Sequence, residues 1–488
     1  MTEISDFATL LLLGAATFAL AVVSTKLTER VPIPTPGLFL GAAAVASSIW
    51  PELHRRLPVQ TVERVAVVAL VVILFNGGID VGWRRFRRSA APILTIGLFG
   101  TFLTAAVIAL VAHYLLGLTW TLSGIVGAAL SPTDPAVMFS VLGRQEIGGR
   151  SGTILEGEAG VNDPAGIALM LGMISFATHP DSSLLVVLRE FAIEMAIGTA
   201  AGLAGAYLFV RVLREIQLKN ETLYPVFALV LAGLLYGATA LAHGSGFLAV
   251  FIFGLVLGNA QAPYKHEIER FHTSLATLAE LTVFVALGLT VTATSLSGTT
   301  WVQGVILLLG LALVARPLTV ATLLAPFRLR RGERAFIAWS GLKGAVPILL
   351  AAFALLDHID GAIHVYGLVF VVVLLSVVGQ GTFVPLVATK CKVPIRERAS
   401  LPWELSMGLE EQPQTAHEFV VRAGSRAENV SISDLPLGTT AWLAVVVRNG
   451  NATRPAGSLK LEADDRVMVL ADDREREGLV DLFTRRSK

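Results

Sequence analysis

Long apolar runs, such as those at 6–24, 91–119 and 364–389, set the strongest limit on how this chain can fold. About 20 helical residues cross the ~30 Å hydrocarbon layer of a bilayer, so each run is long enough to span it. Only 15% of the 488 residues are charged, whereas soluble domains average about 25%. A large soluble helical protein would need charged faces on its exposed helices, and these runs offer none. The sequence therefore predicts an all-α polytopic membrane protein.

The composition changes near residue 400, because residues 401–488 hold 25 of the 75 charged side chains. We expect a membrane domain at 1–390, a linker at 391–414 and a small α+β cytoplasmic domain at 415–488. Short alternating runs in the last part (HEFVVRAG, AWLAVVVRNG and DRVMVLADD) predict strands, and DREREGLVDLFTRR predicts an amphipathic helix. The single cysteine, Cys391, excludes an intrachain disulfide and a cysteine-built metal site. A net charge of +1 carries no information about nucleic acid, and we expect no nucleic-acid partner.

The apolar segments of the membrane part predict about thirteen spans. The second and ninth are short, so whether they cross the whole bilayer is left open. The thirteen segments are 6–25, 34–50, 62–82, 91–115, 119–142, 151–177, 186–211, 222–242, 245–260, 274–292, 301–327, 335–356 and 364–389.

The loops between these segments alternate in charge. Basic residues gather in every second loop, for example at 84–88, 211–219 and 328–334. The positive-inside rule then places the N-terminus outside and the C-terminus in the cytoplasm. An odd number of spans agrees with ends on opposite sides. The first residues lack basic side chains before their apolar run, so we expect a retained first span rather than a signal peptide.

Ionisable groups at membrane depth are costly and are functional candidates by default. The sequence places five of them inside apolar segments: Asp134, Glu158, Asp163, Arg316 and Lys343. Asp80 also follows an apolar run, but its neighbour is the basic WRRFRR cluster, so a loop position explains it equally well.

Two segments cannot form regular helices throughout. SPTDP at 131–135 contains two prolines, and GLKGAVP at 341–347 contains two glycines and a proline. Irregular backbone at membrane depth is tolerated only where it is buried or lines a cavity. Two broken spans in corresponding positions indicate a transporter with inverted repeats and two broken crossing helices. We expect Asp134 and Lys343 to neutralise the ends of the opposed half-helices.

The stretch LEGEAGVNDPAGIAL, residues 155–169, carries the densest set of polar groups. We expect Glu156 at the cytoplasmic entrance and Glu158 in a structural ion pair with Arg316. Asp163 is the deep carboxylate, and Pro164 leaves the carbonyl of Gly160 without its helical donor. One buried carboxylate can hold a proton or a monovalent cation but not both, and that competition is sufficient for exchange. A divalent ion would require more anionic oxygens.

These motifs make the chain resemble the NhaP-type sodium or potassium/proton antiporters of the monovalent cation:proton antiporter-1 family. The resemblance covers about 6–390 and is carried by SPTDPAV, GEAGVNDPAGIAL, ARP at 315–317 and WSGLKGAVPILLA. It implies that Asp163 binds the transported cation and the proton. It implies that Asn162 is its neutral neighbour, which indicates electroneutral exchange of K⁺ or Na⁺ for H⁺.

The resemblance also implies roles for further residues. Thr133 and Asp134 correspond to the unwound crossing in the fifth span, with Thr133 near the ion. Glu158 and Arg316 correspond to the family's buried pair, and Lys343 takes a place usually held by arginine. Ala159 stands where the family often has a serine, so one oxygen ligand is lost. Asn76 can contribute a carbonyl oxygen from the third span. A site with fewer fixed ligands suits potassium, but the ion stays open between K⁺ and Na⁺.

The last 70 residues or so resemble the TrkA-C-like C-terminal domain of potassium-conductance regulators. The resemblance rests on 429–435, the RNGNATRP turn and the LEADDRVMVLA run. It implies homodimers and a small regulatory ligand, such as a nucleotide-like effector, and it favours potassium. The alternative is an assembly module without a ligand. We find no GxGxxG fingerprint, so a nucleotide-binding Rossmann half is not expected.

We therefore expect a bacterial inner-membrane antiporter, not an enzyme, that works by alternating access at Asp163 without a cofactor. Its partners would be the lipid bilayer, monovalent cations and a second copy of itself. An ion channel is one alternative, but no repeated filter segment is present. An intramembrane aspartyl protease is another, because two deep aspartates exist, but its GxGD motif is absent.

Overall fold

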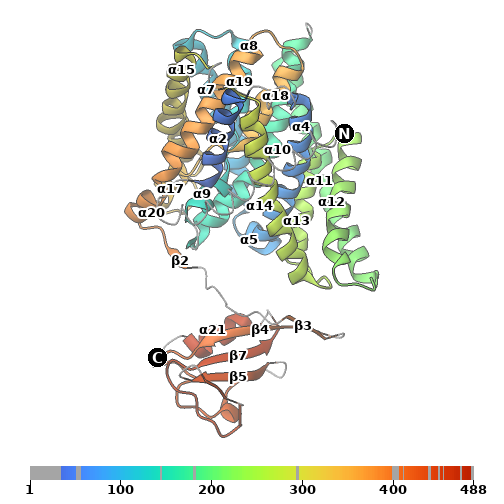
Figure 1. Ribbon diagram of the computed structural model, residues 1–488, viewed down its shortest axis with the longest axis vertical. Helices are drawn as coiled ribbons and strands as arrows, with labels where there is room; N and C mark the ends of the chain where they lie inside the picture. The colour runs from blue at the N-terminus through green and yellow to red at the C-terminus, as the bar shows by residue number, and fades with distance from the viewer. Residues whose placement is uncertain are drawn as a thin grey trace. The chain divides into compact units, whose positions relative to one another are not determined.

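The structure is a computed structural model that describes residues 34–488, with gaps. The gaps are 51–56, 143–144, 180–182, 293–295, 398–405, 410–411, 438–440, 449–450, 454, 473–474 and 485–488. The chain divides into two compact units, Met1–Arg398 and Ala399–Lys488. The first is a bundle of helices and the second contains a small β-sheet (Figure 1).

Each predicted span after the first corresponds to helix in the described residues. The predicted span at 6–25 lies outside them. The uninterrupted helices are α2 (Thr35–Ile49), α4 (Val59–Val81), α10 (Arg150–Thr178), α11 (Leu184–Glu215), α12 (Leu223–Leu241), α13 (Gly246–Leu257) and α14 (Lys265–Leu289).

The other spans are composite. They are α6 (Ala90–Leu94) with α7 (Gly100–Leu116), α8 (Trp120–Ala129) with α9 (Pro135–Leu142), α15 (Gly298–Leu309) with α16 (Arg316–Leu323), α17 (Arg331–Trp339) with α18 (Ala345–Leu356), and α19 (Ala362–Leu375) with α20 (Val384–Lys390).

Among the described residues, eight helical stretches are long and apolar enough to cross a membrane, and four shorter apolar helices accompany them. The short ones include α2 and α13, the second and ninth predicted segments. α13 has 12 residues, about 18 Å of helix, so it does not cross a bilayer alone. α14 starts at Lys265, before the predicted start at 274. Residues 265–273 are helical but polar, so a search for apolar segments did not include them.

The helices pack in two sets. α2, α4, α11, α12, α13 and α14 contact one another, and α7, α8, α10, α15, α18 and α19 form the second set. Close approach within the first set depends on glycine: a Cβ at Gly78 of α4 would overlap the backbone of α13 at Phe251 and Gly254. Small residues of this kind let membrane helices pack at short distance. α10 also contacts helices of the first set, α4, α11 and α13.

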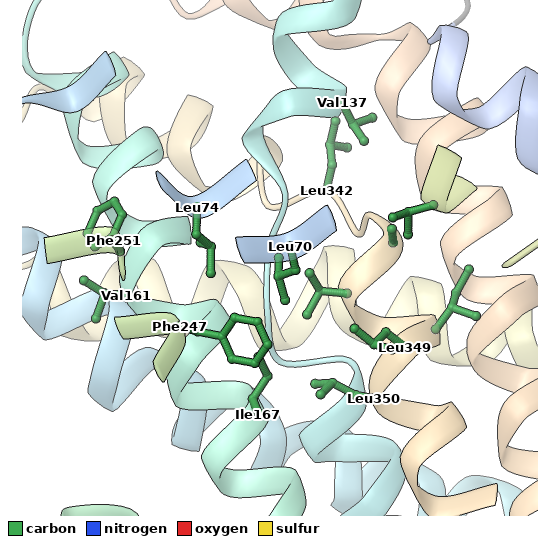
Figure 2. Close-up of a cluster of buried hydrophobic side chains, with 14 of the residues drawn as sticks. Leu70, Leu74, Val137, Val161, Ile167, Phe247, Phe251, Leu342, Leu349 and Leu350 are labelled. Atoms are coloured by element: carbon green, nitrogen blue, oxygen red, sulfur yellow. The ribbon is translucent and has the colours of Figure 1, made fainter. Parts of the chain in front are cut away.

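Both predicted helix breaks are present, and they meet. α8 ends at Ala129 and α9 begins at Pro135, while α17 ends at Trp339 and α18 begins at Ala345. The backbone N–H of Asp134 donates to the carbonyl of Leu342 at 2.8 Å, which joins the two extended segments. Figure 2 shows Leu342 in the second of these segments. Pro347 lies inside α18, in the first turn, where a proline removes no intrahelical hydrogen bond.

Three helices contain π-helical turns, which the sequence analysis did not anticipate. They are η1 (Thr95–Phe99), η3 (Gly310–Ala315) and η4 (Ser376–Gln380). η3 ends next to Arg316, and η4 supplies the Ser376 hydroxyl that accepts from the backbone N–H of Lys343 at 3.1 Å. Wide turns of this type often stand at functional sites. Here they lie beside the buried charges.

The C-terminal unit contains one antiparallel sheet with strand order β3-β4-β7-β5-β6 and the helix α21 (Arg476–Thr484). The strands are β3 (Ser406–Leu409), β4 (Gln412–Val420), β5 (Trp442–Arg448), β6 (Asn451–Thr453) and β7 (Arg466–Ala471). β4, β5, β7 and α21 fall on the four runs that the sequence predicted. Phe419, Val467 and Phe483 are buried in its core.

The predicted linker 391–414 is not structureless. β2 (Ile395–Glu397) pairs antiparallel with β1 (Gln145–Ile147), which follows α9, and so belongs to the membrane unit. β3 and the start of β4 belong to the sheet of the C-terminal unit. The sequence analysis missed this because three-residue strands become evident only when their partner is known.

A bidentate ion pair fastens the C-terminal sheet. Arg448 donates from Nε to Asp465 Oδ1 at 2.8 Å and from Nη2 to Oδ2 at 2.7 Å, and the Glu462 N–H donates to Oδ2 at 2.8 Å. Burial alone would raise the pKa of Asp465, but these hydrogen bonds outweigh it and hold the pKa below its ordinary value of 3.8. The pair therefore stabilises the fold in full above about pH 4, and that contribution is lost as the pH falls through the lower native pKa.

We expect Asp465→Asn to make the C-terminal unit more sensitive to proteases at pH 7, because Arg448 loses its charged partner. The difference from the parent should shrink below about pH 4, where Asp465 is protonated more readily in the unfolded chain. Limited proteolysis of the full chain, with thermolysin at pH 7 and pepsin at acid pH, measures both effects. Equal cleavage of the two proteins at pH 7 would contradict the assigned role.

Candidate functional site

A small cavity lies where the two helix sets meet. Its volume is about 40 Å³, enough for a water molecule or a bare monovalent cation. Three carboxylates line it, Asp134, Asp163 and Glu280, in a wall that is otherwise apolar. The apolar wall comes from α4, α14 and α18 (Ala66, Leu70, Ile73, Val283, Phe284, Ala345, Val346 and Leu349) and from Ala136. Figure 2 shows Leu70, Ile167 and Leu349, from three different helices, gathered in this region.

Asp163 stands near the middle of α10, the most buried of the membrane-length helices that the structure describes. Asp163 is 7% exposed, and α10 continues through Pro164. The side chain of its neighbour Asn162 donates from Nδ2 to Thr133 Oγ1 at 2.7 Å. The Asn162 Oδ1 is buried and has no hydrogen-bond partner among the residues that the structure describes. An unpaired buried carbonyl oxygen next to a carboxylate is a suitable ligand for a cation.

Asp134 and Lys343 contact the ends of the broken helices. Asp134 Oδ1 accepts from the Ala136 N–H at 2.9 Å at the start of α9. A Cβ on Gly344 would overlap the Asp134 carboxyl group, so this group also lies at the start of α18. Carboxylates are stabilised at the positive ends of helices.

Lys343 is completely buried, and its side chain lies at the negative, C-terminal end of α8. Its Nζ donates to the carbonyls of Ser131 at 3.1 Å and Pro132 at 2.7 Å, just past the C-terminal end of α8. Both residues therefore contact the helix ends at the two breaks, and their neutralising role stays a prediction. Asp134 also lines the cavity, together with Asp163.

Glu158 and Arg316 form a forked ion pair between α10 and α16. Arg316 Nη2 donates to Glu158 Oε2 at 2.8 Å, and Nη1 donates to Oε1. Glu158 is 1% exposed and Arg316 is 3% exposed. Arg316 Nη2 also donates to the Ile337 carbonyl at 3.3 Å, and Gly341 leaves the space in which the guanidinium lies. The pair joins α10, α16 and α17 without lining the cavity.

Glu280 of α14 is a cavity residue that the sequence analysis missed. It lines the same space as Asp163, and its Oε1 is buried without a hydrogen-bond partner in the described part of the chain. The available signal was a carboxylate inside the apolar run TLAELTVFVAL of the tenth predicted segment. Only the packing of α14 against α4 and α18 brings it to the α10 site.

The three accessory candidates lie outside the cavity lining. Asn76 donates to Asp80 Oδ2 at 2.8 Å, and its own Oδ1 accepts from Thr273 of α14 at 3.3 Å. Glu156 Oε2 lies 3.9 Å from Arg85 Nη2, and a quarter of the Glu156 side chain is exposed. These groups are near the basic end of the bundle, where Glu156 was expected.

The described residues contain no cluster of three His, Cys, Asp or Glu side chains that could hold a metal ion together.

Comparison with known proteins identifies the family. Residues 13–390 match the model of the transmembrane sodium/hydrogen exchanger family. The chain is 32% identical to the K(+)/H(+) antiporter NhaP2 of Shewanella sp. (strain ANA-3) over 481 residues, 97% of this chain and 83% of that protein. It is 31% identical to the K(+)/H(+) antiporter NhaP of Alkalimonas amylolytica, covering 95% of this chain and 81% of that protein.

The fold is similar to a solved structure, the sodium proton antiporter MjNhaP1 of Methanocaldococcus jannaschii. The TM-score is 0.67 at 22% identity, covering 78% of this chain and 100% of that chain. Neither alternative reading, the channel or the aspartyl protease, is favoured by these matches. The chain belongs to the sodium/hydrogen exchanger family, and it is a membrane-embedded cation/proton antiporter of the NhaP type rather than an enzyme.

Proposed function

We propose that this antiporter exchanges K⁺ for H⁺, one for one, at Asp163. The observation that carries the proposal is the position of Asp163 in a cavity of about 40 Å³ between the two helix sets. A proton or a cation there neutralises the carboxylate, and only the neutral site can pass through the apolar wall. Movement of α9, α10 and α18 relative to α4 and α14 would open the cavity to each side in turn.

Support for potassium comes from two sides. Both relatives named above as K(+)/H(+) antiporters match the chain over nearly its full length, C-terminal unit included. Ala159 offers no hydroxyl ligand one turn before Asp163. K⁺ loses its hydration shell more readily than Na⁺, so binding at a site with few oxygen ligands costs less free energy for K⁺ than for Na⁺. Sodium is the alternative ion.

The wider architecture that we propose has thirteen spans, an N-terminus outside, a cytoplasmic C-terminus and inverted repeats. The composite helices support the repeat. A helix with a π-turn, a broken helix and a third helix occur in that order at 90–178 and again at 298–390. The protein would lie in the inner membrane of a bacterial cell.

We also propose that the C-terminal unit is TrkA-C-like, pairs in a homodimer and takes a small effector, nucleotide-like in character. The mixed sheet-and-helix content of 406–484 supports this. The unit would regulate transport rather than carry the ion, because it has its own core.

The test is cation-driven proton flux in proteoliposomes, with K⁺, Na⁺ and Li⁺ compared in the full chain and in a chain lacking 399–488. We expect K⁺ to drive flux at concentrations about tenfold lower than Na⁺, and the shortened chain to exchange the same ions without regulation. Equal response to Na⁺ would overturn the potassium assignment. Flux that generates a membrane potential would overturn the one-for-one stoichiometry.

Glu280 provides a separate prediction about the same cavity. If its carboxylate helps to hold the cation, Glu280→Gln should raise the cation KM about tenfold, which corresponds to about 1.4 kcal/mol of lost binding, with transport retained. Glu269→Gln is the matched control, because it removes a carboxylate from the same helix, where Glu269 pairs with Lys265 at 3.5 Å. An unchanged KM in Glu280→Gln would show that Glu280 does not contact the ion.

A further inference from the structure

A second and larger cavity, of about 660 Å³, lies apart from Asp163. It is bounded by the short helix α5 (Trp83–Arg88), the last turns of α11 and the C-terminal end of α13. These elements carry two of the basic clusters that the positive-inside rule assigns to the cytoplasmic face. The cavity is therefore at the level where lipid headgroups meet the ends of the helices.

The charge of this cavity is positive. Arg84, Arg211 and Arg214 line it together with one carboxylate, Glu215. Glu215 accepts from Arg211 Nε at 2.7 Å, and both side chains are more than 60% exposed. Two positive charges thus remain in excess, and guanidinium groups suit phosphate because they donate two parallel hydrogen bonds.

Hydrogen bonds to the backbone hold the cavity in shape. Arg214 Nε donates to the carbonyl of Gln261 at 2.6 Å, which directs this guanidinium across the end of α13. The N–H of Arg84 donates to Asn259 Oδ1 at 2.7 Å and ties α5 to the same end. Gly82, with a φ of +65°, allows the sharp turn between α4 and α5. The backbone at Arg84 and the side chain of Arg214 are therefore held against the end of α13.

The cavity also has aromatic and apolar lining residues. Trp83 and Tyr207 line it, and amphipathic rings of this kind settle at the membrane–water interface. α11 continues away from the cavity with a strongly exposed apolar surface, where Leu203 is 46% and Leu208 is 53% exposed. Such a surface on a membrane-spanning helix is suited to acyl chains.

We propose that this cavity binds the headgroup of an anionic phospholipid from the surrounding leaflet, with its acyl chains along α11. Basic pockets between membrane helices on the cytoplasmic side are suited to anionic headgroups. A soluble anion would gain the arginines but not the apolar side. The bound lipid would link the short helix α5 to α11 and α13, two helices of the first set. The proposal is independent of which ion is transported.

The test uses quenching of Trp83 fluorescence by brominated lipids in the purified full chain. Brominated phosphatidylglycerol should quench more than brominated phosphatidylcholine, and Trp83→Phe should remove that excess. The variant Arg84→Gln/Arg211→Gln/Arg214→Gln should weaken the phosphatidylglycerol effect at least tenfold. The matched control Arg87→Gln/Arg88→Gln/Arg328→Gln removes the same charge from exposed positions that do not line the cavity, and it should leave the effect unchanged.

Equal quenching by the two lipids, or a loss of the effect in the control variant, would overturn the proposal. Full competition by inorganic phosphate or glycerol 3-phosphate would assign the cavity to a soluble anion and overturn it as well. If the triple variant does not fold, Arg211→Gln alone serves, because that side chain is 63% exposed. It should weaken the lipid effect severalfold, and an unchanged effect would contradict the assignment.

Discussion

Asp163→Asn is expected to abolish cation/proton exchange completely while the protein still folds. Asparagine has nearly the shape of aspartate, so the packing of α10 is kept. Its amide takes up no proton at physiological pH and does not neutralise a cation, so neither half of the exchange remains. Among the residues that line the cavity, Asp163 alone is on the helix that carries the GEAGVNDPAGIAL motif.

The measurement is dye-reported proton flux in proteoliposomes after addition of K⁺ or Na⁺. Asp357→Asn is the control, because it makes the same chemical change at an exposed position after α18. Asp163→Asn should elute as the parent protein does in size-exclusion chromatography. Any cation-dependent flux above that of empty liposomes would remove Asp163 from the centre of the mechanism, and Asp134 or Glu280 would have to replace it.

Glu158→Ala is expected to lower stability by about 3–5 kcal/mol, the usual cost of leaving one partner of a buried ion pair without the other. The loss comes from Arg316, whose guanidinium stays charged and stays buried. Flux should fall mainly because less folded protein is present. This distinguishes the pair from Asp163, where folding is kept and transport is lost.

A double variant separates the ion pair from the other contacts. Glu158→Ala with Arg316→Met removes both charges, and it should recover a large part of the lost stability because no buried charge is left unpaired. Thermal unfolding midpoints in detergent, read by size exclusion, compare the three proteins. A single variant as stable as the parent would show that the pair does not support the fold.

Parts of the site could be predicted from local sequence because they depend on one helix or one break. Asn162 and Asp163 are neighbours, so any fold that makes 155–169 a buried helix places them together. The prolines at 132 and 135 end a helix wherever they occur. The pairing of Glu158 with Arg316 was open to inference because few cations stand inside apolar runs, and a buried carboxylate needs one.

Other parts needed the tertiary structure. Glu280 is one acid in an apolar segment, and nothing in that segment says which helix it faces. The same is true of Asn76, which contacts Thr273 of α14 at 3.3 Å rather than the cavity. β1 and β2 pair although residues 145–147 and 395–397 lie far apart in the sequence, and strands of three residues leave no pattern that could be recognised.

By itself, the sequence determined the membrane class, the order of the helical segments after the first, both helix breaks and the adjacent Asn162 and Asp163 around which exchange is proposed. These follow from hydrophobicity and backbone chemistry, which act over a few residues at a time. The tertiary structure decided which carboxylates share the cavity, where Lys343 and Arg316 find their acceptors, and that a second, basic cavity exists. Those depend on helix packing, and packing brings together residues whose separation along the chain carries no information about contact.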